Sequence, residues 1–214
     1  MPSLIRKHIL TTDLMALSAN DISGLILAGG RSTRMGGRDK GLQILDGQPM
    51  IAHIIERLQP QVGSLLINAN QNHESYEVFG FPITADVMGD FVGPLAGLHA
   101  GLNQCTTPYL LSVPCDCPFL PSDLASRLGD ALISSGADIA YAVTINQNQT
   151  EHHPVFCLLK RDVMVGLGEY LSEGNRKVLT WVSSQPHVQV VFDDHSAFLN
   201  INTPDDLKTI NASR

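Results

Sequence analysis

Short apolar runs alternate with helix-like segments along most of this chain, and this alternation restricts the fold more than any other feature. Runs of this kind are typical of strands that are buried on both faces of a sheet. They cover residues 22–28, 64–69, 109–113 and 138–143. Because helix-like segments separate them, the sequence predicts an α/β fold: a three-layer, Rossmann-like, mostly parallel sheet with helices on both faces.

The segments between the runs have the pattern of amphipathic helices. In residues 121–133, Leu124, Leu128 and Leu132 recur at helical spacing and share one face. The predicted helices are residues 49–58, 93–102, 121–133, 162–171 and 175–183, and further strands are predicted at 153–159 and 187–192. A last helix is expected to begin in residues 203–206, because threonine can cap a helix and proline fits its first turn.

The size and composition of the chain fit one folded domain. It has 214 residues, of which 43% are hydrophobic and 16% charged, so it can bury a substantial core. Residues 1–20 are too broken for a secretory apolar segment, and no long apolar span follows. We therefore expect a loose extension over residues 1–20, with Met15 as an alternative start, and a single domain over residues 21–214. We expect a cytoplasmic location and no membrane contact.

The four cysteines, at positions 105, 115, 117 and 157, are interpreted as reduced thiols. The alternative is a zinc site made by the two cysteines that flank Asp116 together with His152 and His153. Their spacing matches no standard pattern of zinc ligands.

A glycine-rich, basic segment follows the first predicted strand: Gly29-Gly-Arg-Ser-Thr-Arg-Met-Gly-Gly-Arg-Asp-Lys40. Paired glycines let backbone N–H groups approach an anion closely, and the segment also concentrates cations. These are Arg31, Arg34, Arg38 and Lys40. We interpret the segment as a phosphate-binding loop, although it is neither a P-loop nor a Rossmann fingerprint. The alternative is an ordinary turn whose basic residues face solvent.

The overall charge narrows the class of ligand. The net charge is -7, which argues against nucleic-acid binding, because proteins of that kind need an extended basic surface. A cationic loop on an acidic chain instead predicts a small anionic ligand such as a polyphosphate.

Polar side chains follow other predicted strands and are expected to lie near this loop. Ligands of open α/β sheets collect at the carboxyl ends of the strands. Asp116, between two prolines, is the best candidate for a Mg²⁺ ligand, because Mg²⁺ takes one or two protein carboxylates along with water and phosphate oxygens. Asp86 and Asn68 suit the adjacent N1–H and N2–H donors of guanine. Turn capping by Asp116, and Asx turns at the other two, are the alternatives.

Seven motifs, in this order, resemble the molybdenum cofactor guanylyltransferases. They are Leu27-Ala-Gly-Gly30, Arg34-Met-Gly-Gly37, Asp39-Lys40-Gly41, Asn68-Ala-Asn70, Gly93-Pro-Leu-Ala-Gly97, Pro114-Cys-Asp-Cys-Pro118 and Asn200-Ile-Asn-Thr-Pro204. The resemblance extends from about residue 22 to 210 and implies a fold of the nucleotide-diphospho-sugar transferase type. The Leu-Ala-Gly-Gly form is typical of guanylyl enzymes, whereas related cytidylyltransferases usually have Leu-Ala-Ala-Gly. Cys117 replaces the family's usual threonine or methionine and leaves Asp116 in place.

The resemblance also implies roles for individual residues. Arg34, Lys40 and Asp116 would be catalytic, and Asp116 would hold Mg²⁺, with Asn200 or Asn202 near the metal. The GTP site, in about residues 22–120, would comprise Leu27, Ala28, Gly29, Lys40, Asn68, Asp86 and Asp116. An acceptor region for a pterin, in about residues 140–205, would include His153, Arg176 and Lys177. For Arg176 and Lys177, a solvated basic helix start is the alternative.

The reaction that the resemblance implies is attack of the terminal phosphate of molybdenum-molybdopterin on the α-phosphorus of GTP, with release of pyrophosphate. It also implies transfer of the pterin from a molybdenum-insertion protein and onward to molybdoenzymes or their chaperones. Three alternatives stay open: cytidylyl transfer to the same pterin, nucleotidyl transfer to a sugar phosphate, and a nucleotide-binding regulatory or adaptor protein without turnover.

Overall fold

A seven-stranded sheet forms the centre of the molecule. The computed structural model describes residues 16–29, 39–87, 93–201 and 206. The strand order is β5-β4-β1-β6-β8-β7-β9, and β8 is antiparallel to both of its neighbours while the other pairs are parallel. The strands are β1 (Ile22–Leu27), β4 (Ser64–Asn68), β5 (Ile83–Thr84), β6 (Tyr109–Pro114), β7 (Ile139–Asn146), β8 (Gln149–Lys160) and β9 (His187–Phe192). A small separate hairpin joins β2 (Ile44–Leu45) and β3 (Gln48–Pro49).

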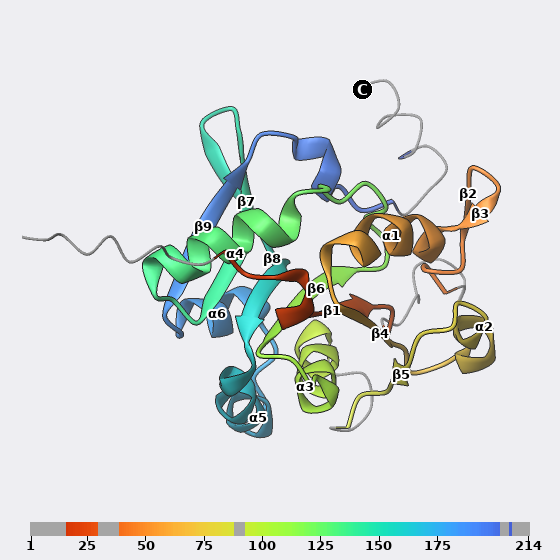
Figure 1. The fold of residues 1–214 in the computed structure, drawn as a ribbon, viewed down its shortest axis with the longest axis horizontal. Coiled ribbons are helices and arrows are strands. Elements are labelled where there is room, and N and C mark those ends of the chain that lie inside the picture. The colour runs from red at the N-terminus through yellow and green to blue at the C-terminus, as the bar shows by residue number, and fades with distance from the viewer. Residues whose placement is uncertain (1–15, 30–38, 88–92, 202–205, 207–214) are drawn as a thin grey trace, which may run out of the picture.

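Helices cover both faces of this sheet, as predicted (Figure 1). On one face, Ile54 of α1 and Leu128 of α4 pack in a core with Ile26 of β1. On the other face, Leu98 of α3 and Trp181 of α6 belong to a second core that also includes Leu167 of α5. The helices are α1 (Met50–Leu58), α2 (His73–Glu77), α3 (Pro94–Gln104), α4 (Leu124–Ser135), α5 (Met164–Ser172) and α6 (Val178–Ser183). None of the helices within the described ranges is long and apolar enough to cross a membrane.

Strands β7 and β8 form a long hairpin. Gln147 and Asn148 at its tip both have positive φ angles, as a two-residue type I′ turn requires. The pairing register jumps within the hairpin: Tyr141 lies opposite Cys157, but Ala142 lies opposite His153. Pro154 stands in this irregular stretch, where a residue without an N–H group removes no regular ladder bond. The irregularity changes the direction of the side chains around His153.

Several boundaries differ from those expected. Two residues of the expected extension make defined contacts: Ser18 caps a short 3-10 turn, η1 (Ala19–Asp21), and Leu17 packs against the first core. Helix α4 begins at Leu124 rather than 121, and α6 begins at Val178 rather than 175. Further 3-10 turns are η3 (Gln59–Gln61), η4 (Arg161–Val163) and η5 (His195–Phe198). The expected helix start at residues 203–205 lies outside the described residues, and Asp206 is helical.

Candidate functional site

The carboxyl ends of β1, β4 and β6 open into one cavity of about 460 Å³. The cavity extends from these strand ends to β8 and to the segment that follows η5. Its lining residues therefore come from two parts of the chain, residues 27–116 and residues 152–200. Its lining includes Leu27, Ala28, Gly29, Lys40, Asn68, Asp86, Asp116, His152, His153, Pro154, Phe198 and Asn200. All seven residues predicted to contact the nucleotide are therefore brought to one place, together with one predicted acceptor residue.

Asp116 is a buried acid of the cavity that is held by contacts with distant residues. Its side chain is 10% exposed, and its Oδ2 accepts hydrogen bonds from Lys40 Nζ at 2.9 Å and Asn200 Nδ2 at 3.2 Å. The backbone carbonyl of Asp116 also accepts from the N–H of Ile201 at 2.8 Å. These contacts fix the carboxylate between the basic loop and the carboxyl-terminal segment. The described contacts of Asp116 therefore join distant parts of the chain, unlike those of a local turn cap.

The donor set around Asp116 fits a hard divalent cation. Asp116 supplies a carboxylate at a strand end, and its Oδ1 has a long contact of 3.8 Å with Cys117 Sγ. The Asn200 amide oxygen accepts from the same thiol at 3.2 Å, which holds the amide beside the carboxylate. A cation bound by the Asp116 carboxylate and the neighbouring Asn200 amide oxygen would have room in its coordination shell for phosphate oxygens and water. This is the usual arrangement for Mg²⁺.

A second polar network lies at the ends of β4 and β5. Asn68 Nδ2 and Asn70 Nδ2 donate to the two carboxylate oxygens of Asp86 at 3.0 and 2.8 Å, and the Asp86 N–H donates to Asn70 Oδ1 at 2.8 Å. Asn70 Nδ2 also donates to the carbonyl of Gly29 at 3.2 Å. These bonds cross between strands, so they form a platform rather than isolated Asx turns. A carboxylate oxygen accepts more than one hydrogen bond, so Asp86 keeps capacity for a ligand.

Two glycines make this platform possible. A Cβ atom on Gly97 of α3 would lie 2.4 Å from Asn68 Oδ1, and one on Gly29 would lie 2.9 Å from the same oxygen. Such distances are far below normal van der Waals contact, so any side chain there would displace Asn68. Close approach of the helix and the loop to Asn68 therefore explains both glycines.

Asp39 supports the site from below the cavity lining, and no separate role was predicted for it from the sequence. It is buried, and its carboxylate accepts from Tyr76 OH at 2.5 Å, Asn72 Nδ2 at 3.1 Å and the Gly41 N–H at 3.1 Å. Burial, followed by nearby Cys115 and Asp39, raises the pKa of Tyr76, which keeps the phenol protonated as a donor. The network anchors the backbone directly next to Lys40. Its sequence signal was its place in the Asp39-Lys40-Gly41 motif, one residue before the lysine.

The acceptor candidates separate in the structure. His153 lines the cavity and stacks on Phe198 with ring centroids 4.7 Å apart. Burial lowers the pKa of the His153 imidazole, which favours the neutral ring. Arg176 instead donates to the carbonyls of Leu171 and Asn175 at the end of α5, and it is not among the cavity-lining residues, nor is Lys177. Of the three acceptor candidates, His153 is thus the one that the described structure places beside the predicted nucleotide residues.

The other residues singled out from the sequence are those of the basic loop, Asn202 and the four cysteines. Arg31, Arg34, Arg38 and Asn202 lie outside the described residues. The four cysteines are free and buried. Burial, and then the charge of Asp116, raises the pKa of the Cys115 and Cys117 thiols. Among the described residues, the cluster with metal-ligand geometry is Glu151, His153 and His195, so the alternative zinc set of the two cysteines and the histidine pair is not formed.

Comparison with known proteins places this site in a family. Residues 24–189 match the MobA-like NTP transferase domain. A molybdenum cofactor guanylyltransferase of Cupriavidus necator is 53% identical over 194 residues, covering 90% of this chain and 98% of the relative. One of Ralstonia nicotianae is 52% identical over 199 residues, covering 91% and 98%.

The chain belongs to the molybdenum cofactor guanylyltransferase family. It is thus an enzyme of the nucleotidyltransferase class, as predicted. The fold of this guanylyltransferase family member is also confirmed. The molybdopterin-guanine dinucleotide biosynthesis protein A of Archaeoglobus fulgidus has a TM-score of 0.70 at 22% identity, covering 89% of this chain and 97% of its own. A CMP:2-keto-3-deoxy-manno-octonic acid synthetase has a TM-score of 0.68 at 14% identity, covering 90% and 97%.

Proposed function

We propose that the chain transfers GMP from GTP to the terminal phosphate of molybdenum-molybdopterin, forming molybdopterin guanine dinucleotide cofactor and pyrophosphate. The observation that carries the proposal is the shared cavity, in which the Asp86 platform, the Lys40–Asp116 pair and His153 line one space. The names of relatives at about half identity support the same reaction. The acceptor, the cytoplasmic location and transfer of the pterin between carrier proteins and molybdoenzymes are parts of this proposal.

In this proposal the base of GTP binds at the Asp86 platform. Guanine offers two adjacent N–H donors, and the Asp86 carboxylate is held by Asn68 and Asn70 so that it faces the ligand without needing to reorganise. Cytosine presents a different edge with one amino donor. The platform therefore favours GTP over CTP.

The chemical step needs alignment and neutralisation of charge rather than a protein nucleophile. The acceptor phosphate is already anionic near neutral pH, so it attacks the α-phosphorus directly. Lys40, fixed 2.9 Å from Asp116 and anchored through Asp39, would neutralise charge that develops on the triphosphate. Arg34 would bind the leaving pyrophosphate from the basic loop. His152 and His153 need not act as general bases.

Asp116, with Asn200 beside it, would hold Mg²⁺ at the triphosphate. When bound, this ion supplies Lewis-acid polarisation of the phosphate oxygens. The carboxylate is required for the charge it carries, since an amide of the same shape binds Mg²⁺ weakly. Asp116→Asn is therefore the natural inactive variant.

The test measures pyrophosphate release with Mg²⁺, molybdate-loaded molybdopterin and either GTP or CTP. We expect release with GTP, little with CTP, and none from the Asp116→Asn variant. Preference for CTP would transfer the same mechanism to the cytidylyl reaction. Release with a sugar phosphate in place of the pterin would overturn the acceptor, and nucleotide binding without any release would favour a regulatory protein.

A binding experiment tests the acceptor region separately. We propose that His153 contacts the pterin phosphate, with Arg176 and Lys177 as weaker candidates outside the cavity lining. Calorimetry on His153→Ala and on the Arg176→Ala, Lys177→Ala double variant compares pterin affinity with GTP affinity. Loss of pterin binding alone supports a contact, whereas unchanged pterin binding removes that residue from the site.

A further inference from the structure

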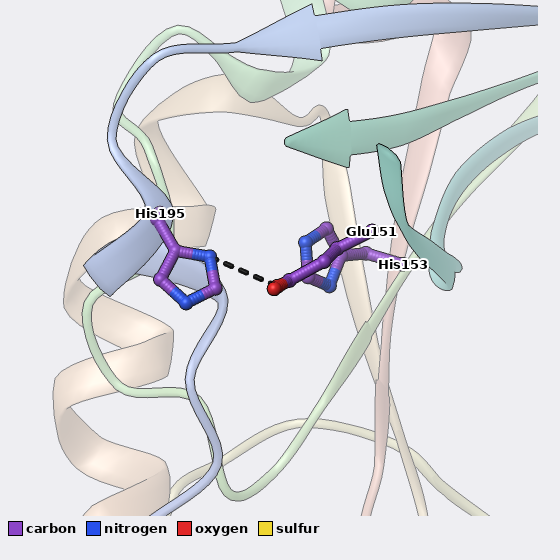
Figure 2. A group of neighbouring side chains, drawn as sticks. All are labelled: Glu151, His153 and His195. Atoms are coloured by element: carbon purple, nitrogen blue, oxygen red, sulfur yellow. Dashed lines mark ion pairs between the residues drawn. The ribbon is translucent and has the colours of Figure 1, made fainter. Parts of the chain in front are cut away.

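A cluster of three ligand-type side chains lies at the acceptor end of the cavity. Glu151 and His153 are two residues apart on β8, so they project from the same face of the strand. His195 approaches them from η5 (Figure 2). One ligand atom from each of the three side chains lies within 4.8 Å of the other two. Residues from two separate elements therefore converge on one point.

We propose that Glu151, His153 and His195 form a binding site for a divalent transition metal of the zinc class. Two imidazoles and one carboxylate are a ligand set that zinc takes in proteins. Imidazole nitrogens suit zinc and its neighbours, whereas carboxylate and amide oxygens suit Mg²⁺. The site therefore differs in chemistry from the one at Asp116, and it does not depend on the proposed transfer reaction.

The distances are compatible with coordination. A tetrahedral zinc ion with bonds of about 2.0–2.1 Å holds its ligand atoms roughly 3.3 Å apart. His195 Nδ1 already lies 3.1 Å from Glu151 Oε2. The ligand atom of His153 lies within 4.8 Å of the other two, so it has to move closer when an ion binds. The ion would lie between the three ligand atoms.

The surroundings hold the ligands in place. The hydroxyl of Thr144 on β7 lies 2.9 Å from His153 Nε2 and 3.3 Å from His195 Nδ1, next to both ligand nitrogens. Thr144 is buried, so its hydroxyl is available as a fixed polar neighbour of the ion. The stacking of His153 on Phe198 fixes β8 against η5 from the other side. The side chains of Glu151 and His195 are 41% and 34% exposed, which leaves an entry path from solvent.

Binding at this site would connect the hairpin to the segment that leads to Asn200. Asn200 follows η5 by two residues and donates to Asp116, so an ion held by His195 would stabilise that end of the cavity. We therefore expect zinc to raise the thermal stability of the chain as well as to bind it. A ligand that binds only the folded state stabilises it by mass action.

The test titrates Zn²⁺ and Co²⁺ into the metal-stripped full chain with Mg²⁺ in excess, so that hard oxygen sites are occupied. We expect one ion per chain by calorimetry and elemental analysis, a higher midpoint of thermal unfolding, and shifted imidazole NMR signals for two histidines with Co²⁺. Glu151→Gln and His195→Gln should each weaken binding by more than about tenfold, the range seen when metal surroundings are altered.

Two controls separate this site from others. His187→Gln removes an imidazole on β9 that contacts the carbonyl of Gln185, and it should leave zinc affinity unchanged. Asp116→Asn should also bind zinc normally, although it is expected to lack transferase activity. Absence of saturable zinc binding to the unmodified chain would overturn the proposal. The proposal would also be overturned if Glu151→Gln or His195→Gln bound zinc as tightly as the unmodified chain does. This comparison uses variants that circular dichroism shows to be folded.

Discussion

Lys40 lies at the centre of the charge arrangement in the cavity. Its ammonium group contacts Asp116 Oδ2, and the buried Asp39 fixes the backbone beside it. A cation held in this way is pre-organised, so it needs little rearrangement as charge develops on a transferring phosphoryl group. The same ion pair keeps the Asp116 carboxylate, with 10% of its side chain exposed, from being buried without a partner.

We expect Lys40→Met to reduce kcat/KM for GTP by about 10²–10³, the usual effect of removing one pre-organised electrostatic group. Lys160→Met is the matched control, because Lys160 makes a similar ion pair with Asp138 at 2.8 Å. The exposed fractions of the two lysine side chains are also similar, 34% for Lys160 and 30% for Lys40. Lys160 does not line the cavity, so its variant should retain activity. Normal turnover by folded Lys40→Met, measured as pyrophosphate release, would exclude a catalytic lysine.

The thiols give a second prediction at this scale. Burial raises the pKa of Cys157 to about 12 and raises those of Cys115 and Cys117 as well. Because the thiolate is the reactive form, the native chain at pH 8 should react with a disulfide reagent only as fast as it unfolds. Guanidinium should then expose all four cysteines. A rapid reaction of the native chain would show that a thiol is accessible.

Among the elements, α3 approaches the sheet closely at two glycines: a Cβ on Gly97 would lie 2.4 Å from Asn68 Oδ1, and one on Gly101 would lie 2.5 Å from Leu25 Cδ2. Gly97 lets the helix lie against Asn68, which in turn holds the Asp86 carboxylate. The helix begins at Pro94, after Gly93 with φ of 83°, so the chain turns sharply just before the platform. Helix α3 therefore supports the Asp86 platform through its contact with Asn68.

Gly97→Ala should raise KM for GTP at least tenfold, because the added methyl group displaces Asn68 and with it Asp86. Gly166→Ala is the control: Gly166 lies in α5 with nothing within 4 Å of a Cβ, so alanine there should stabilise the fold by about 1 kcal/mol and leave KM unchanged. Steady-state kinetics and thermal unfolding of both variants measure this. An unaltered KM for Gly97→Ala would mean that Asn68 is not needed in its observed position.

The elements also show where sequence reasoning succeeds. Strand β1 was predicted nearly to the residue, because a short, mostly apolar segment that ends at a glycine pair is typical of a buried strand. Strand β8 is longer than expected, since its first residues, Gln149 to Glu151, are polar and carry no apolar signal. The Asp39–Tyr76 contact joins residues 37 positions apart, and a glycine motif does not indicate which atom it must avoid. The strand-end positions of Asn68, Asp86 and Asp116 were predictable, whereas their hydrogen-bond partners were not.

At the scale of the whole molecule, the two halves of the chain share one sheet: residues 22–114 supply β1, β4, β5 and β6, and residues 139–192 supply β7, β8 and β9. Strand β8 lies between β6 and β7 and pairs with both. The cavity likewise takes residues from both halves. Neither half therefore has a complete sheet or a complete site, which supports the expectation of a single domain.

A fragment of residues 16–146 tests this expectation. It contains β1 to β7 but lacks β8 and β9, so β6 loses one neighbour and β7 loses both. We expect no cooperative thermal transition by circular dichroism, whereas residues 16–214 should unfold in one step. A sharp transition in the fragment would indicate that the nucleotide half is an independent domain.

The same strand order has a consequence for synthesis on the ribosome. Strands β6 and β7 leave the exit tunnel before β8, the strand that joins them, so each carries an unpaired edge on the side of β8 until the residues up to Lys160 have emerged. Unpaired edges are sites where nascent chains associate wrongly. The interval between the emergence of Asn146 and that of Lys160 from the tunnel is therefore a period in which these edges can pair wrongly, and slow codons translated during it should lower the yield of folded protein.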